Sequence, residues 1–172
     1  MIAIVAPLLA ACAPVPQPAL QAPPQVAFSA PYNSNNPFAL IVRGTLPAAK
    51  VYEDRDVLAF MDNAPASPGH VLVILKRSQA RNLLEIRNSE LKRLFRVARR
   101  IGAAELAGLG ADGFTIEQNN GYGQSVPHFH IHVIPRYAGY SRCPASGIRQ
   151  PLNVLEPFAV ALRAALADRA RR

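Results

Sequence analysis

Residues 124–136 spell QSVPHFHIHVIPR, and this stretch decides how the rest of the chain is interpreted. Three of the four histidines in the protein lie in it, at every second position, with apolar residues between them. A two-residue period is typical of a half-buried β-strand, because successive side chains point to opposite faces. The pattern predicts a strand over residues 125–134, with Phe129, Ile131 and Val133 in the core and the histidines in a row on the other face.

The three histidines, His128, His130 and His132, have three candidate roles. A polar strand face that happens to use histidine would explain one imidazole, but it explains three in strict alternation poorly. Neutral imidazoles at this spacing could bind zinc or a similar ion. An imidazole nitrogen is also a nucleophile at neutral pH, and its neighbours could donate hydrogen bonds to phosphate oxygens and a leaving group. Spacing alone leaves the metal role and the nucleophilic role open.

The remaining residues predict an α+β domain, in which five antiparallel strands carry one long helix across a face. Asn36 and Pro37 predict the start of a short helix over residues 38–43, which Gly44 ends. The other predicted elements are strands over residues 50–53, 57–61, 70–75 and 113–118, a short helical segment over 80–86, and a carboxyl-terminal helix over 157–170.

The long helix is predicted to be capped by Asn88 or Ser89 and to end at Gly108 and Gly110. One face of this helix is predicted to be apolar and the opposite face basic, in a chain whose formal net charge is +8. No aromatic residues interleave with the arginines of the basic face, as single-stranded nucleic acid would require, so we expect a solvated surface and no specific nucleic-acid partner. The net charge keeps a nucleic-acid patch open as the alternative. The predicted apolar stripe consists of Leu91, Leu94, Phe95, Ala98 and Ile101.

The segment HFHIHVIPR, preceded by GQSVP, resembles the signature of the histidine-triad (HIT) nucleotide-binding family. The resemblance extends to NPFALIVRGTLPAAKVYEDRDVLAFMDNAPASPGHVLVILKR and GFTIEQNNGYGQSV, and it covers about residues 36–136. It implies a HIT-like fold with a short amino-terminal helix and a five-stranded antiparallel sheet. It also implies a homodimer in which two sheets join side by side.

The resemblance implies a catalytic role for each histidine. His130 would attack the α-phosphorus of a purine nucleotide derivative and form a nucleotidyl-histidine intermediate, which water hydrolyses. His132 would contact the α-phosphate or protonate the leaving group, and His128 would orient the cluster. His70 matches the family's upstream histidine and would lie beside His128. For the lone pair of Nε2 of His130 to face phosphorus, Nδ1 must carry the proton of the ring. We expect Nδ1 to donate this proton in a hydrogen bond to a backbone carbonyl.

The resemblance also implies four nucleotide-binding residues. Asp62 matches the position that accepts hydrogen bonds from ribose hydroxyls, although its pattern alone would indicate a turn former. Gln124 and Ser125 match positions that hold phosphate oxygens, and Asn119 matches a polar position near the phosphate. The retained part would be AMP or a similar monophosphate, from a phosphoramidate, an acyl-adenylate or a dinucleoside polyphosphate. We have no physical account of residues 137–147, which would discriminate among these leaving groups.

Many bacterial relatives carry a Cys-x-x-Cys pair near the first helix that helps bind a structural zinc. This chain has no cysteine between residues 13 and 142, so we expect no metal and no cofactor. A HIT-type nucleotide hydrolase or transferase is therefore the first hypothesis. A nucleotide-binding interaction module with little catalysis is the second. A histidine metalloenzyme is the third, disfavoured because no carboxylate or further histidine stands beside the triad in sequence.

The chain is long enough for one folded domain, which we place at residues 32–140, with a tail at 141–172. Residues 1–31 are rich in Ala and Pro and predict a flexible leader. Within it, Leu9-Ala10-Ala11-Cys12 resembles the lipobox of a bacterial lipoprotein signal, but no Lys or Arg precedes the apolar run. We expect a cytoplasmic protein. The alternative is an exported lipoprotein, anchored to a membrane only if Cys12 is lipidated.

Overall fold

The computed structural model describes residues 30–121, 123–139 and 148–170. Outside these ranges lie the leader up to residue 29, with Cys12, and most of residues 137–147. What the sequence predicts for these two segments therefore stays a prediction. Within the ranges, no helix combines the length and apolar character that crossing a membrane requires. The elements are α1 (Pro37–Val42), β1 (Lys50–Glu53), β2 (Val57–Met61), β3 (Val71–Leu75), α2 (Asn88–Gly108), β4 (Gly113–Glu117), β5 (His130–Arg136) and α3 (Leu152–Ala170).

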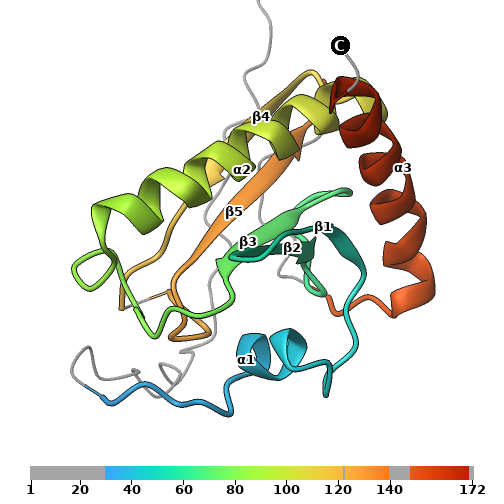
Figure 1. Cartoon of the computed structure of the whole chain (residues 1–172). Coiled ribbons are helices and arrows are strands. Elements are labelled where there is room, and N and C mark those ends of the chain that lie inside the picture. Colours follow the sequence, from blue (N-terminus) through green and yellow to red (C-terminus); the bar gives the residue numbers. More distant parts are fainter. Residues whose placement is uncertain (1–29, 122, 140–147, 171–172) are drawn as a thin grey trace, which may run out of the picture.

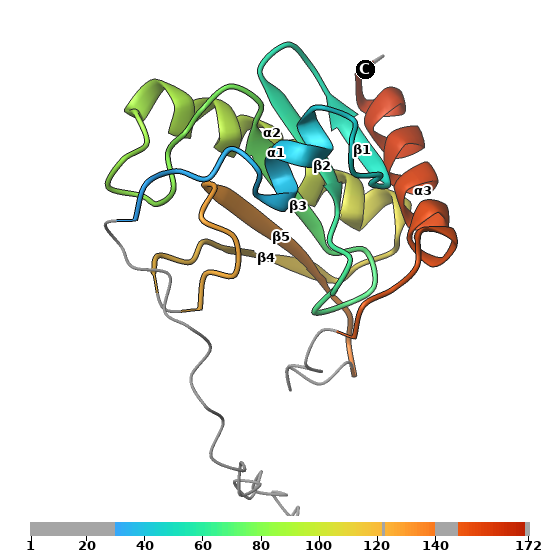
Figure 2. The ribbon, with the colours of Figure 1, turned by 90° about the horizontal axis from the view of Figure 1, so that it is seen from below.

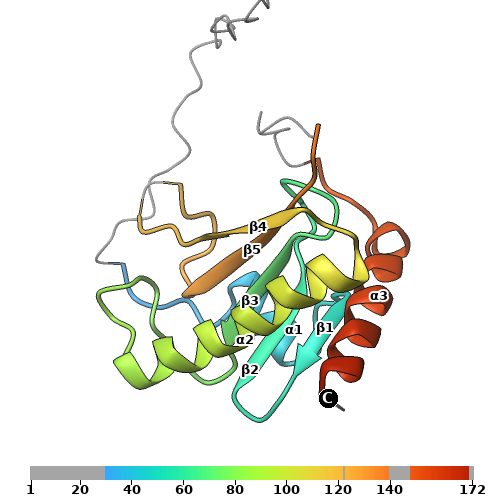
Figure 3. The ribbon, with the colours of Figure 1, turned by 90° about the horizontal axis from the view of Figure 1, so that it is seen from above.

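The strands form one antiparallel sheet in the order β1-β2-β3-β5-β4. Helices α2 and α3 lie on one face of this sheet, and the short α1 lies on the other (Figures 1 and 2). Figure 3 shows α2 lying over the sheet, with α3 beside β1. The predicted α+β fold with a five-stranded antiparallel sheet is confirmed.

Two apolar clusters fill the space on the two faces of the sheet. Neighbouring residues of β2 belong to different clusters, because their side chains point to opposite faces of the sheet. Val57 and Ala59 belong to the large cluster under α2 and α3, whereas Leu58 and Phe60 belong to the small cluster under α1. The histidine face of β5 is the α1 face, because His130 pairs with Ile74, a member of the small cluster.

Helix α1 has the predicted caps. The Oδ1 atom of Asn36 accepts a hydrogen bond from the backbone N–H of Ala39 at 3.0 Å, and Pro37 occupies the first turn. Gly44 follows the helix with φ of 78°, a conformation that glycine adopts without strain. The caps place Phe38 and Ile41 against the sheet, so α1 is a fixed cover over the histidine face.

Several predicted boundaries were wrong. Strand β5 begins at His130 rather than at residue 125, and residues 80–86 form turns instead of a helix. Helix α2 begins after Arg87, whose backbone N–H donates to the Glu90 carboxylate at 3.2 Å. Phe95, predicted to be in the core, is 45% exposed.

Helix α3 begins at Leu152, five residues before the predicted start, and contains Pro157. Proline within a helix removes one backbone hydrogen bond, which is a local cost. Burial of one apolar stripe against the sheet and α2 compensates for this cost, because apolar surface leaves water. The stripe consists of Leu155, Ala159, Leu162 and Leu166.

Candidate active site

His128 lies in the loop before β5 and not on the strand itself. Its Nε2 atom is 3.0 Å from the backbone oxygen of Leu75, and its Nδ1 atom is 2.7 Å from the hydroxyl of Tyr32. A carbonyl oxygen only accepts, so Nε2 carries the proton, and Nδ1 accepts the hydrogen bond that Tyr32 donates. Both ring nitrogens of His128 are therefore engaged within the protein, which suits an orienting role.

His130 begins β5, with its ring against the edge of α1. Its Nδ1 atom is 2.7 Å from the backbone oxygen of His128, and must donate because the carbonyl can only accept. The predicted hydrogen bond to a backbone carbonyl is therefore present. The Phe38 ring stands edge-on to the imidazole, with centroids 5.0 Å apart. In neutral His130 this arrangement leaves the lone pair on Nε2.

Burial, as the largest cause, and neighbouring His132 together lower the pKa of His130 to about 4. Burial is also the main cause that lowers the pKa of His128 and of His132 to about 4. Because these values lie well below neutrality, the imidazoles are uncharged at pH 7. A neutral ring keeps the lone pair that a nucleophile needs.

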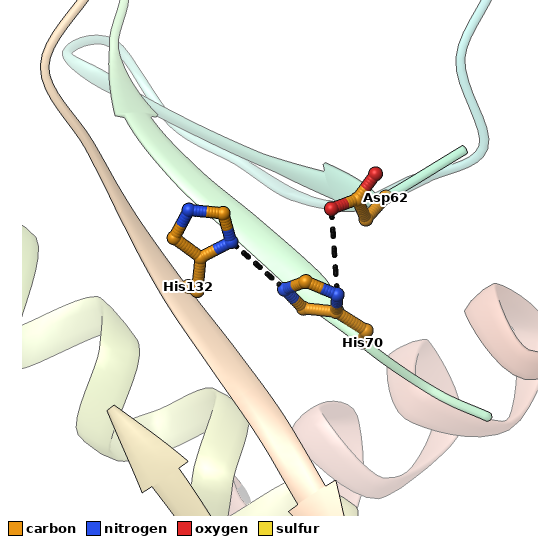
Figure 4. A group of neighbouring side chains, drawn as sticks. All are labelled: Asp62, His70 and His132. Carbon is orange, nitrogen blue, oxygen red and sulfur yellow. Dashed lines mark hydrogen bonds and ion pairs between the residues drawn. The ribbon is translucent and has the colours of Figure 1, made fainter. Parts of the chain in front are cut away.

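His132 forms a chain with His70 and Asp62, shown in Figure 4. Its Nδ1 atom is 3.0 Å from Nε2 of His70, and Nδ1 of His70 is 3.3 Å from Oδ2 of Asp62. His70 was predicted to lie beside His128, and that prediction was wrong. The antiparallel register pairs Leu72 with His132, so His70 is the diagonal neighbour of His132 on the same face.

The chain of Asp62, His70 and His132 also has the composition of a metal site, with one donor atom of each residue within 4.8 Å of the others. A metal takes one nitrogen from each imidazole, and the lone pairs must converge on it. Here Asp62 faces Nδ1 of His70 while His132 faces Nε2, on opposite sides of the ring. Nδ1 of His70 also accepts a hydrogen bond from the backbone N–H of Ala66 at 3.1 Å, so the lone pairs do not converge and the geometry does not suit a ligand set.

A carboxylate and a fourth histidine do reach the triad in space, although none stands beside it in sequence. The metalloenzyme was disfavoured because no such residue stands beside the triad in sequence, and the fold removes that reason. The positions of Asp62 and His132 on opposite sides of the His70 ring now disfavour a metal site instead. The structural zinc of bacterial relatives does not fit this chain either. Asn36 stands in the segment without thiolates, where its Oδ1 caps α1 and its Nδ2 donates to the carbonyl of Asn33 at 2.7 Å.

The predicted nucleotide-binding residues occupy different positions around the triad. Asp62 accepts a hydrogen bond from the backbone N–H of Ala64 at 2.8 Å, as a turn former does, and it also lines a cavity. The Nδ2 atom of Asn119 is 3.5 Å from Nε2 of His132. Ser125 is exposed and lines the cavity. Gln124 is buried, and its amide group is bound to the backbone of Arg81, Val126 and Gly121.

A cavity of about 580 Å³ opens over the histidine face. This volume lies within the range of small-molecule sites, about 300 to 1,000 Å³. Among the predicted site residues, Asp62, Ser125, His130 and His132 line it, whereas His128 and His70 lie behind them. Its lining combines apolar residues, several of them from α1 and β2, with the imidazoles of His130 and His132. The apolar residues include Phe38, Ile41, Leu46, Phe60, Leu72 and Leu152.

Two residues near the site were missed by the sequence analysis. Tyr32 hydrogen-bonds to His128 from 96 positions away, and no local pattern marks such a pairing. Arg149 lines the cavity from the segment before α3, where an isolated arginine resembles any surface arginine. Only the fold brings these two residues to the site.

Comparison with known proteins agrees with this geometry. The family model described as HIT domain matches residues 43–139. An uncharacterized HIT-like protein of Methanocaldococcus jannaschii is 42% identical over 104 residues, which are 59% of this chain and 79% of that protein. An adenosine 5'-monophosphoramidase of Schizosaccharomyces pombe is 35% identical over 101 residues, covering 58% of this chain and 72% of the relative.

Solved structures give the same result. A Hit-like protein of Bartonella henselae, described as involved in cell-cycle regulation, superposes with a TM-score of 0.74 at 40% identity, covering 79% of this chain and 99% of that one. A zinc-bound histidine triad family protein of Mycobacterium smegmatis gives 0.68 at 35% identity, covering 78% and 94%. With the family model spanning more than half of its residues and the triad in place over a cavity, this chain belongs to the HIT family.

Proposed function

We propose that this chain is a nucleotide hydrolase or transferase that cleaves at the α-phosphate of a purine nucleotide derivative. One observation carries the proposal. Nδ1 of His130 is held by the His128 carbonyl, so the lone pair of Nε2 is free in a neutral ring that lines the cavity. The complete triad favours an enzyme over a binding module with little catalysis.

In the first step, Nε2 of His130 forms a bond to the α-phosphorus while the bond from phosphorus to the leaving group breaks. The leaving group takes a proton from water as it departs, and the Nε2–H group of His132 donates a hydrogen bond to the α-phosphate or to the leaving group. His132 carries its proton on Nε2 when its Nδ1 accepts from Nε2 of His70, whose Nδ1 in turn accepts from the backbone N–H of Ala66 at 3.1 Å. These two hydrogen bonds therefore keep a donor on the cavity side of His132.

In the second step, water attacks phosphorus, the bond between phosphorus and His130 breaks, and the proton of the attacking water passes to solvent. Asp62 would accept hydrogen bonds from the ribose hydroxyls, and Ser125 would hold phosphate oxygens. The retained product would be AMP or a similar purine monophosphate. Phosphoramidates are favoured among the leaving-group classes, because the related Schizosaccharomyces pombe protein is an adenosine 5'-monophosphoramidase.

The decisive experiment replaces His130 by Asn, whose amide can still donate to the His128 carbonyl. Turnover of adenosine 5'-phosphoramidate should fall by at least about a thousand-fold, because the nucleophile is lost. Binding of AMP should persist, and mass spectrometry of the wild type should detect a nucleotidyl adduct on His130. Full activity in His130→Asn would end the proposal. Nucleotide binding by a wild type that turns over none of the leaving-group classes would favour the binding module.

We also propose that two copies pair through β4, one of the two edge strands of the described sheet. An edge strand offers unpaired backbone groups to another strand. Beside it, Phe114 of β4 packs on Gly102 of α2, and Phe114, Phe95 and Leu106 are exposed apolar residues along this side. Light scattering should give about 37 kDa, twice the chain's 18.6 kDa. Leu106→Glu should lower the mass while Arg96→Glu, on another side of α2, should not. A monomeric wild type would refute the pairing.

A further inference from the structure

Part of the cavity wall comes from outside the matched domain. The family model ends at residue 139, yet Arg149, Leu152 and Leu155 line the cavity together with His130 and His132. This segment is firmly held. The backbone N–H of Gln150 donates to the backbone oxygen of Asn63 at 2.7 Å, and Leu155 is buried in the large core. The wall is therefore part of the folded site.

The wall lies on the β1 and β2 side of the cavity. Helix α3 packs against β1, β2 and α2, whereas the triad is carried by β5, on the far side of β3. Asn63, which binds Gln150, directly follows Asp62. Arg149 is thus placed beyond Asp62 and away from the strand that would hold the phosphate and leaving group.

Arg149 carries the single formal positive charge in the described cavity lining. The lining histidines are neutral, and Asp62 is the one acidic lining residue. Arg149 is exposed and makes no hydrogen bond or ion pair with the described residues. Its five N–H donors are therefore available to a ligand, and a guanidinium has no acceptor.

A nucleotide bound as proposed above has one orientation in this cavity. With the α-phosphate at His130 and the ribose at Asp62, the base lies against the apolar lining residues, between α1 and the start of α3. An aromatic base suits the Phe38 and Phe60 rings there. The edge of the base then faces Arg149. This orientation rests on the proposed function.

We propose that Arg149 recognises the base edge, so that the site favours guanine or hypoxanthine nucleotides over adenine nucleotides. Guanine and hypoxanthine present two acceptors, O6 and N7, to a forked donor. Adenine presents N7 and an amino group, so one donor of the guanidinium would face another donor. A bidentate contact of this kind discriminates between bases by about five-fold to 150-fold.

The test is calorimetric titration of the full chain with GMP, IMP and AMP. In the wild type, GMP and IMP should bind at least about five-fold more tightly than AMP. IMP lacks the 2-amino group, so agreement between IMP and GMP assigns the preference to the O6 and N7 edge. Arg149→Ala should abolish the preference by weakening GMP and IMP while leaving AMP nearly unchanged.

Arg149→Lys separates edge recognition from simple attraction of an anion. Lysine keeps the charge but lacks the planar fork, so the preference should fall in this variant as well. Arg96→Ala, an exposed arginine of α2 that does not line the cavity, should behave as wild type. Equal affinities in the wild type, or a preference that survives in Arg149→Ala, would overturn the inference and leave the proposed function standing. Failure of all three nucleotides to bind would overturn both.

Discussion

Glu105 on α2 is a completely buried carboxyl group, and neither of its oxygens has a hydrogen-bond partner among the described residues. Burial raises its pKa from 4.5 to about 8, because a charge in an apolar interior is poorly solvated. In the unfolded chain the same carboxyl is in water and ionises with its ordinary pKa. The contribution of Glu105 to stability should therefore fall as the pH rises.

The direction and size follow from proton linkage. Below pH 4.5 both states hold the proton, and the contribution of Glu105 to stability is fully present. Between pH 4.5 and about 8 only the unfolded state ionises, so stability falls until the folded state ionises as well. An interval of about 3.5 pH units at about 1.4 kcal/mol per unit gives a loss of about 5 kcal/mol.

Replacing Glu105 by Gln removes the titration and keeps the shape of the side chain. Urea unfolding followed by circular dichroism should give similar free energies of unfolding for both proteins near pH 4.5. At pH 8 the variant should be more stable by up to about 5 kcal/mol. The buried histidines also titrate in this range, but they are common to both proteins and cancel in the difference.

Glu156→Gln is the matched control. This carboxylate is exposed and pairs with Arg163 at 2.7 Å, so its replacement should produce no stabilisation that grows with pH. A difference between wild type and Glu105→Gln that is the same at pH 4.5 and pH 8 would refute the reasoning. So would a variant that is less stable than wild type at pH 8.

Three further predictions concern the triad. Because burial lowers the pKa of His130 to about 4, kcat/KM should stay level from pH 8 to below pH 6 and fall only near pH 4, and a midpoint near 6.5 would contradict this. Tyr32→Phe leaves Nδ1 of His128 without its donor, so kcat should fall by about five-fold or more with KM unchanged, whereas Tyr52→Phe, whose hydroxyl donates to Asp54, should not affect kcat. Washing with a chelator should leave activity intact, because both nitrogens of His128 are hydrogen-bonded, and stoichiometric zinc in the washed protein would refute this.

The sequence predicted the fold well wherever a local pattern carries the information. The bounds of β1 and β2 follow from short apolar runs beside a turn, and those of α1 from its caps. The start of β5 could not be predicted in this way. A strand exists only where it has a partner, and β3 ends at Leu75, so residue 128 has no place on its ladder. Alternation alone does not reveal where the neighbouring strand stops.

The site was predicted in composition but not in its pairings. The placement of His70 beside His132 depends on the register between β3 and β5, and a shift of register changes every such pair. Tyr32 and Arg149 come from opposite ends of the chain and reach the site only through tertiary structure. Resemblance to a family supplies the residues that match its motif, and neither of these two lies within the matched range of 43–139.

The three triad histidines have the same spacing, yet their partners give them different chemistry. His128 has both nitrogens bound to protein groups, and His132 has one nitrogen on His70 and the other near Asn119. His130 alone has one nitrogen held by a carbonyl and the other without a hydrogen bond in the described part of the chain. Because a nucleophile needs an unshared lone pair, the hydrogen bonds rather than the spacing favour His130 as the proposed nucleophile.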